Sequence, residues 1–192
     1  MVLPIIAYGD PVLRKTGEKI DKDYPNLNEL IANMKETMKN ARGVGLAAPQ
    51  IGKAIRLFIV DTSPFSENEE LEKEEQNFLK NYKKVFINPT IINEEGNQWA
   101  FSEGCLSIPN INEDVFRNEK LTIEYFDENF KKYTEDLSGL TARVIQHEYD
   151  HIEGILFTDK LSSLKKRLLK KKLTNISKGK VDVDYRMKFP KK

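Results

Sequence analysis

The first strongly periodic segment of the chain spans residues 26–41. Its apolar side chains recur every three or four positions, as on one face of an α-helix; they are Leu27, Leu30, Ile31, Met34 and Met38. Asn26 stands at the position of an N-cap, with Glu29 three residues later. The pattern predicts a helix that begins near residue 27.

Several segments in the middle of the chain have the composition of β-strands. The β-branched and apolar run 55–61 predicts a buried strand, and the polar, acidic stretch that follows it, residues 63–84, predicts an inserted surface excursion that is partly helical. Residues 85–92 and 98–104 flank the sequence EEGN, which predicts two extended segments around a tight turn. Residues 120–127 and 131–137 predict a second hairpin.

Two more helices are predicted after these strands. The first runs from about Ser138, a possible cap, to Gly154, which can end it. The second begins near Ser162 or Ser163 and contains the sequence LKKRLLKKKL. Its leucines are expected to pack on the body of the protein while its cations face outward; they are Leu161, Leu164, Leu168 and Leu169. This order of elements predicts an α+β fold, with largely antiparallel sheets wrapped around a central helix and a further helix at the C-terminus.

Composition and charge refine this picture. With 192 residues, 39% of them hydrophobic and 32% charged, the chain is expected to form one soluble domain without a signal peptide or a membrane span. A single cysteine is typical of a reducing cytoplasm. The net charge of +1 conceals an acidic body, because 13 of the 31 Lys and Arg residues lie between 160 and 192. This basic tail favours a polyanionic partner.

The predicted helix 138–154 carries both histidines of the chain. His147 and His151 are four residues apart, so one helical face can present both imidazoles to a metal ion, with Glu148 beside them. A five-residue match can also arise by accident on a solvated helix. That alternative weakens because both histidines fall within the motif, on the same stripe as core residues.

A catalytic metal usually has three protein ligands and one open position. No third histidine exists, so Cys105, in the sequence EGCLSIP, is the remaining soft ligand, although an isolated cysteine is more often a small buried hydrophobe. The sequence GVGLAAPQIG, residues 43–52, lets another backbone approach closely, and Gln50 could donate an amide hydrogen to a developing oxyanion. A simple tight turn would explain this segment about as well.

Together, the sequences GVGLAAPQ, EGCLS and QHEYDH resemble the three signature motifs of the peptide deformylase family, in the same order and spacing, over roughly residues 1–160. The resemblance implies a metallohydrolase that removes the N-formyl group from the N-terminal formylmethionine of newly synthesised proteins and releases formate. It implies that Cys105, His147 and His151 bind one divalent metal, with Fe2+ expected and Ni2+, Co2+ or Zn2+ able to substitute. Glu148 would then be the general base, and the Gln50 side chain and the Leu106 backbone N–H would stabilise the oxyanion.

The same resemblance suggests how a substrate would bind. A nascent peptide would add as a strand along Gly43, Val44 and Gly45. Val44, Leu140 and Val144 are candidates by position for the walls of the methionine pocket, and ordinary core packing explains their apolar character as well. Three further residues are placed by analogy: Glu103 as a supporting carboxylate, Arg143 as a polar group at the pocket rim, and Asn112 where some members have a substrate-binding arginine.

The organisation that follows is a catalytic domain of residues 1–160 with an acidic insertion at about 63–84, and a basic helix and tail, residues 161–192, within the same domain. The expected partners are N-formylmethionyl nascent peptides in the bacterial cytoplasm and the ribosome, reached through the basic helix; no membrane partner is expected. Two alternatives remain: a zinc endopeptidase, which shares the HExxH motif, and a non-enzymatic, metal-stabilised module that binds RNA through its tail.

Overall fold

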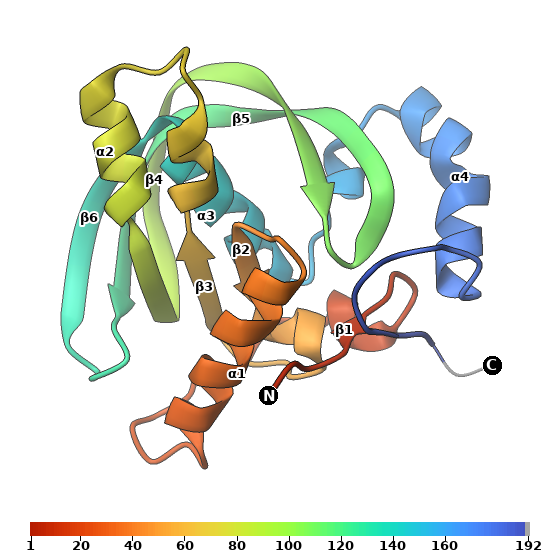
Figure 1. Cartoon of the computed structure of the whole chain (residues 1–192), viewed down its shortest axis with the longest axis horizontal. Coiled ribbons are helices and arrows are strands. Elements are labelled where there is room, and N and C mark those ends of the chain that lie inside the picture. The colour runs from red at the N-terminus through yellow and green to blue at the C-terminus, as the bar shows by residue number, and fades with distance from the viewer. Residues whose placement is uncertain (191–192) are drawn as a thin grey trace.

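A computed structural model describes residues 1–190 of the chain (Figure 1). The strands are β1 (Ile5–Ile6), β2 (Gly45–Ala47), β3 (Leu57–Asp61), β4 (Lys83–Cys105), β5 (Ile108–Phe126), β6 (Lys132–Ser138) and β7 (Met187–Lys188). The α-helices are α1 (Leu27–Asn40), α2 (Lys73–Asn81), α3 (Gly139–Ile152) and α4 (Ser163–Ser177). Short 3-10 helices span Pro11–Arg14, Ala48–Ile51, Ser63–Glu67 and Phe157–Lys160.

The sheet is five-stranded and antiparallel, in the order β2-β3-β4-β5-β6, and it separates two apolar clusters. Alternate residues of β3 point to opposite faces. Leu57 and Ile59 pack with α1, whereas Phe58 and Val60 pack in the cluster that contains Val144 of α3. The predicted α+β fold, with a largely antiparallel sheet around a central helix, is confirmed.

The prediction of a tight turn at the sequence EEGN, residues 94–97, is wrong. Residues 83–105 form one long strand, β4, which pairs with β5 and not with itself. Gly96 adopts a φ of 81°, and the register shifts between the pairs that contain Glu95 and Gln98. A glycine in this conformation permits a bulge that bends a continuing strand. The hairpin of β5 and β6 is confirmed.

The predicted helices are present, but two of their caps differ. Asn26 precedes α1 in the left-handed conformation and its side chain makes no capping hydrogen bond; the Ser138 side chain makes none either. Ser162 does cap α4, since its hydroxyl accepts a hydrogen bond from the Lys165 backbone N–H. The acidic stretch 63–84 contains a 3-10 helix, α2 and the start of β4.

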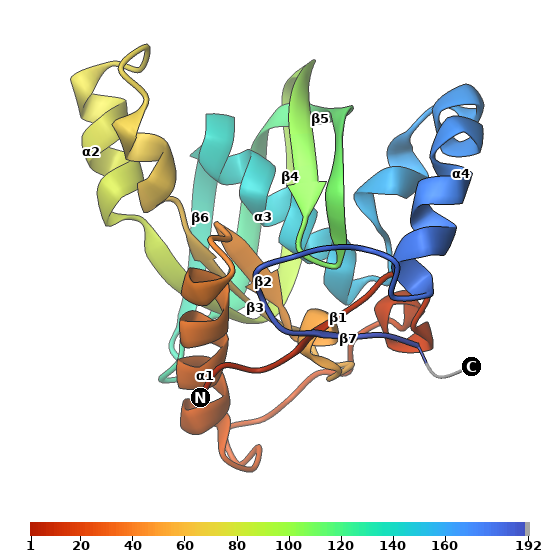
Figure 2. The same ribbon diagram turned by 45° about the vertical axis from the view of Figure 1, so that its right-hand side comes forward.

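Helix α4 packs through a different stripe from the one predicted. Leu169, Leu173 and Ile176 are buried, as is Leu161 before the helix, but Leu164 and Leu168 are 62% and 70% exposed. Because α4 stands at the edge of the molecule, one stripe of the helix suffices to cover the apolar cluster beneath it (Figure 2). The prediction that Leu164 and Leu168 pack on the body is therefore wrong.

After α4 the chain turns at Gly179, where φ is 72°, and runs back past the turn between β4 and β5 (Figures 1 and 2). Residues 187–188 then form β7, which pairs in parallel with β1. Within residues 1–190, no helix is both long enough and apolar enough to cross a membrane.

Candidate metal centre and active site

Three potential metal ligands meet at the centre of the molecule. His147 and His151 lie one turn apart on α3, with ring centroids 5.1 Å apart, and Cys105 ends β4 opposite them. Sγ of Cys105 is 3.2 Å from Nε2 of His151, and one ligand atom from each of the three residues lies within 4.8 Å of the others. A thiolate and two imidazoles in this arrangement fit a divalent transition metal with an open fourth position.

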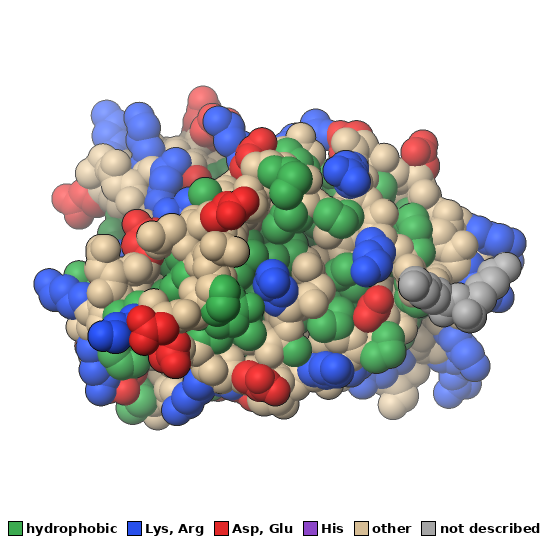
Figure 3. Space-filling view, turned by 90° about the horizontal axis from the view of Figure 1, so that it is seen from below, with side chains coloured by type: hydrophobic (Ala, Val, Ile, Leu, Met, Phe, Trp, Pro, Cys, Tyr) green, Lys and Arg blue, Asp and Glu red, His purple; other side chains and the backbone are tan. Residues whose placement is uncertain are grey.

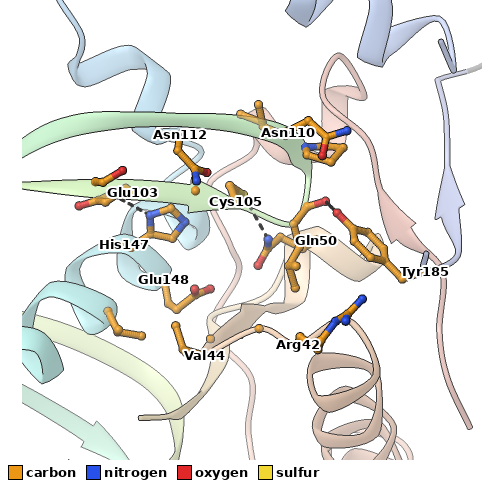
Figure 4. Close-up of a pocket in the computed structure, with 18 of the residues that line it drawn as sticks. Arg42, Val44, Gln50, Glu103, Cys105, Asn110, Asn112, His147, Glu148 and Tyr185 are labelled. Carbon is orange, nitrogen blue, oxygen red and sulfur yellow. Dashed lines mark hydrogen bonds and ion pairs between the residues drawn. The ribbon is translucent and has the colours of Figure 1, made fainter. Parts of the chain in front are cut away.

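The orientation of His147 is fixed by a buried carboxylate. Nδ1 of His147 lies 2.9 Å from Oε2 of Glu103, which leaves Nε2 for a metal (Figure 4). Glu103 also binds Arg117 through two hydrogen bonds of 2.6 and 2.9 Å and accepts one of 3.0 Å from Arg143. Burial would raise the pKa of Glu103, but hydrogen bonds from Arg117 and His147 hold it well below its usual range. Glu103 is therefore an anion that supports the ligand.

The charge network continues behind the site. Arg117 donates a 2.6 Å hydrogen bond to Asp150 on α3, so it ties β5 to both β4 and the histidine helix. The guanidinium of Arg143 lies 4.4 Å from the centroid of the Trp99 ring and donates to the backbone carbonyls of Trp99 and Val115. Neither Arg117 nor Asp150 could be recognised from sequence pattern, because their roles depend on the register of β4 and β5.

Glu148 is buried beside the three ligands with only 4% exposure. Its Oε2 has no hydrogen-bond partner within the described chain, and a side chain at position 45 would overlap its carboxylate. Gly45 is thus required by the close approach of β2 to Glu148. Burial raises the pKa of Glu148 to about 7, despite the opposing charges of His147 and Arg117. A carboxyl group with that pKa can both accept and return a proton near neutrality.

The side-chain amide nitrogen of Gln50 points toward Cys105, one of the three potential ligands. Its Oε1 accepts a 2.8 Å hydrogen bond from the Ala47 backbone, so Nε2 faces Sγ of Cys105 and Oγ of Ser107, each at 3.5 Å. Leu106 lies in the two-residue turn that follows Cys105. The structure therefore brings together Cys105, His147, His151, Glu148, Gln50 and Leu106 from three separate segments of the chain.

A cavity of about 760 Å³ opens onto this centre. Of the predicted substrate-binding residues, Gly43, Val44, Gly45 and Val144 line it, whereas Leu140, in the first turn of α3, does not. Arg143 and Asn112 line it as well, and a Cβ atom at Gly104 would lie 2.5 Å from Oδ1 of Asn112.

Several lining residues were not predicted from the sequence. Phe65 and Phe101 form an aromatic edge, with their rings 6.5 Å apart. Arg42, at the end of α1, faces the tail residues Asp184 and Tyr185 across the opening (Figure 4). Phe101 lies in a segment that was predicted to be extended. The tail residues 182–185 have no sequence pattern that would link them to the cavity.

Three ligands with an open position, a buried carboxylate and an amide donor at the floor of a cleft define a metal-dependent hydrolase. A model of the polypeptide deformylase family matches residues 2–167. A peptide deformylase of Christiangramia forsetii is 67% identical over 190 residues, covering 99% of this chain and 97% of that protein, and one of Flavobacterium psychrophilum is 65% identical, covering all of both.

Solved structures agree with these matches. A peptide deformylase from Thermus thermophilus superposes with a TM-score of 0.79 at 38% identity, covering 93% of this chain and 99% of that one. One from Legionella pneumophila gives 0.78 at 36% identity, covering 93% and 96%. The chain therefore belongs to the polypeptide deformylase family. It is a hydrolase that removes the N-formyl group from newly synthesised proteins.

Proposed function

We propose that Cys105, His147 and His151 hold one divalent metal ion, with Fe2+ as the native ion and Ni2+, Co2+ or Zn2+ as substitutes. The observation that carries this proposal is the convergence of the three ligand atoms within 4.8 Å, next to the Glu148 carboxylate. When bound, the ion would lower the pKa of a water molecule and polarise the formyl oxygen. The thiolate of Cys105 favours a softer ion, and its oxidation would inactivate the enzyme.

Glu148 is the proposed general base. A water molecule beside its carboxylate loses a proton to Glu148 as the water oxygen bonds to the formyl carbon. The Gln50 amide and the Leu106 backbone N–H donate hydrogen bonds to the formyl oxygen as negative charge develops there. The carbon–nitrogen bond then breaks, Glu148 returns its proton to the leaving amine, and formate departs. The pKa of about 7 suits both steps.

The substrate is proposed to bind as an extra strand. β2 is an edge strand of the sheet, and residues 43–45 line the cavity at that edge. Main-chain hydrogen bonds to this edge would accept a nascent peptide whatever its sequence. The side chain of the formylmethionine would enter between Val44, Val144 and Phe101, where the lining is apolar.

One set of variants tests these roles. Glu148→Gln should keep the metal but lose about 10² to 10⁴ in turnover, because only the base is removed. Gln50→Ala should keep the metal and lose about 10² to 10³. Cys105→Ala should lose the metal itself. Metal content and formate release are measured on the same anaerobic preparations. A metal-free Glu148→Gln protein, or a fully loaded Cys105→Ala protein, would contradict the assignment.

We also propose that α4 docks on the ribosome, in the cytoplasm where nascent chains emerge. Lys166, Arg167, Lys170, Lys171 and Lys172 are exposed on this helix, whereas Lys165 pairs with Glu113 at 2.7 Å. Lys and Arg side chains project at the end of the molecule where α4 lies (right in Figure 3). Exposed cations on one helix suit a phosphate backbone. The alternative is a solvated helix that only balances the acidic body.

A further inference from the structure

The turn after Cys105 is held from outside its own hairpin. Leu106 and Ser107 connect β4 to β5, with Cys105 paired to Ile108. The carbonyl groups of two such turn residues point away from the strand ladder and need other partners. The Ser107 carbonyl accepts a 2.9 Å hydrogen bond from the Tyr8 backbone N–H, and the Leu106 carbonyl accepts one of 2.8 Å from the Tyr185 hydroxyl. Both partners lie far away in the sequence, one near each end of the chain.

These two ends are also bound to each other. β1 and β7 pair in parallel, with Ile5 opposite Met187 and Ile6 opposite Lys188. The backbone N–H of Ile5 donates to the Arg186 carbonyl at 2.8 Å, directly after Tyr185 in the chain. The Tyr8 backbone N–H and the Tyr185 hydroxyl therefore both belong to segments that are joined by the pairing of β1 and β7. We call these paired segments, residues 5–8 and 185–188, the terminal brace of the turn.

The tail between Gly179 and Tyr185 has anchors of its own on both rims of the cleft. Asn110, on β5, donates a 3.1 Å hydrogen bond to the Asp182 carbonyl. Asp184 forms an ion pair with Arg42 at the end of α1. Val181, Met187 and Phe189 pack against the apolar cluster beneath α4. These contacts fix the position of Tyr185 above the turn (Figure 4).

We propose that Tyr185 is a positioning residue for deformylation: its hydrogen bond to the Leu106 carbonyl fixes the turn that presents the Leu106 N–H to the substrate. This inference rests on the proposed oxyanion role of that N–H group. The Leu106 carbonyl and N–H belong to adjacent peptide groups. Rotation of the peptide group that carries the carbonyl therefore also moves the group that carries the N–H. Burial raises the pKa of Tyr185, so its hydroxyl remains a donor near neutral pH.

Tyr185→Phe tests this role because it removes the hydroxyl and keeps the packed ring. The free energy of one neutral hydrogen bond corresponds to a factor of about 2 to 10 in an equilibrium or rate constant. We expect kcat for a formyl-methionyl tripeptide to fall by that factor with KM unchanged, because an oxyanion donor acts only in the transition state. The absorption spectrum of the Co2+-loaded protein should not change, and the melting temperature should fall by no more than a few degrees. Tyr133→Phe, which removes a hydroxyl from β6 away from the turn, is the matched control and should leave kcat unchanged.

Asp184→Asn tests whether the tail acts through Tyr185. Loss of an exposed ion pair corresponds to a factor of about 1.4 to 5, and we expect kcat to fall within that range. In the Tyr185→Phe background the same change should not lower kcat further. If the two losses in kcat multiply in the double variant, the tail does not act through Tyr185.

The outcomes separate this inference from the proposal on which it rests. If Gln50→Ala lowers turnover but Tyr185→Phe leaves kcat unchanged or raises only KM, the positioning role is wrong and the oxyanion assignment stands. If neither variant changes turnover, the oxyanion assignment itself is wrong.

Discussion

Oε2 of Glu103 lies 2.9 Å from Nδ1 of His147, and the same carboxylate accepts two hydrogen bonds from Arg117. The anion is thus shared between a metal-ligand candidate and a buried cation. Removal of its charge would leave the imidazole free to rotate, would take the Glu103 counter-ion from the buried Arg143, and would leave the buried Arg117 paired with Asp150 alone.

Glu103→Gln should therefore weaken metal binding by about 10- to 100-fold, the usual effect of losing a carboxylate behind a histidine ligand. Competition between the protein and a chelator for Co2+ measures this affinity. Glu124→Gln, which changes a partly exposed carboxylate on β5 that pairs with Lys132, is the control. Equal affinity in Glu103→Gln and the unmodified protein would show that Glu103 does not support the site.

The basic helix should bind ribosomes in a salt-sensitive manner. Each neutralised phosphate releases counter-ions, so binding by the unmodified chain should fall steeply as salt rises. Replacing Lys165, Lys166, Arg167, Lys170, Lys171 and Lys172 with glutamine should abolish this binding and leave deformylation of short peptides nearly unchanged. Co-sedimentation with ribosomes at several salt concentrations measures it.

The matched control replaces six exposed lysines on other surfaces: Lys19, Lys22, Lys39, Lys73, Lys80 and Lys120. This variant has the same net charge as the helix variant. If both bind ribosomes as the unmodified chain does, or both lose binding equally, α4 is not a specific docking helix.

Stability should fall in acid partly through Glu135. This carboxylate forms an ion pair with Lys84 and accepts hydrogen bonds from the hydroxyl groups of Tyr125 at 2.7 Å and Tyr82 at 3.0 Å. Burial would raise its pKa, but Lys84 and Tyr125 lower it below its usual value. A lowered folded-state pKa means that the stabilisation is present above the unfolded-state value of about 4.3 and is lost as the pH falls through the folded-state value.

Glu135→Gln should accordingly be less stable than the unmodified protein at pH 7, and the difference should shrink as the pH falls from 5 to 3. Urea unfolding across this range measures both free energies. Glu119→Gln changes an exposed carboxylate of β5 outside this cluster and should show no such trend. A difference that stays constant with pH for Glu135→Gln would refute the mechanism.

The sequence was most informative where local pattern and chemistry coincide. The helix with His147 and His151, the buried strand β3 and the hairpin of β5 and β6 follow from short-range periodicity. The EEGN segment was predicted wrongly because it contains residues that favour turns. In the structure β4 pairs with β5 on both sides of this segment, and this non-local pairing overrides the local preference.

The tail could not be predicted for the same physical reason. Its order depends on contacts with Ile5, Asn110 and Arg42, which are distant in the sequence, and no periodicity encodes them. The role of Arg117 likewise appears only once β4 and β5 are aligned. The sequence pointed to the side chains that meet at the floor of the cleft and to Glu103, whereas Arg117, Asp150 and the tail were found only in the structure.

We infer that this site hydrolyses N-formyl groups with Glu148 as the base. The most direct measurement is formate release from a formyl-methionyl tripeptide by the anaerobically purified protein, with the acetyl analogue as control substrate. We expect formate and a free methionine amine from the formyl peptide, no cleavage of the acetyl peptide, and almost no turnover by a metal-loaded Glu148→Gln variant. Cleavage of internal peptide bonds without formate release, or an active Glu148→Gln variant, would contradict it.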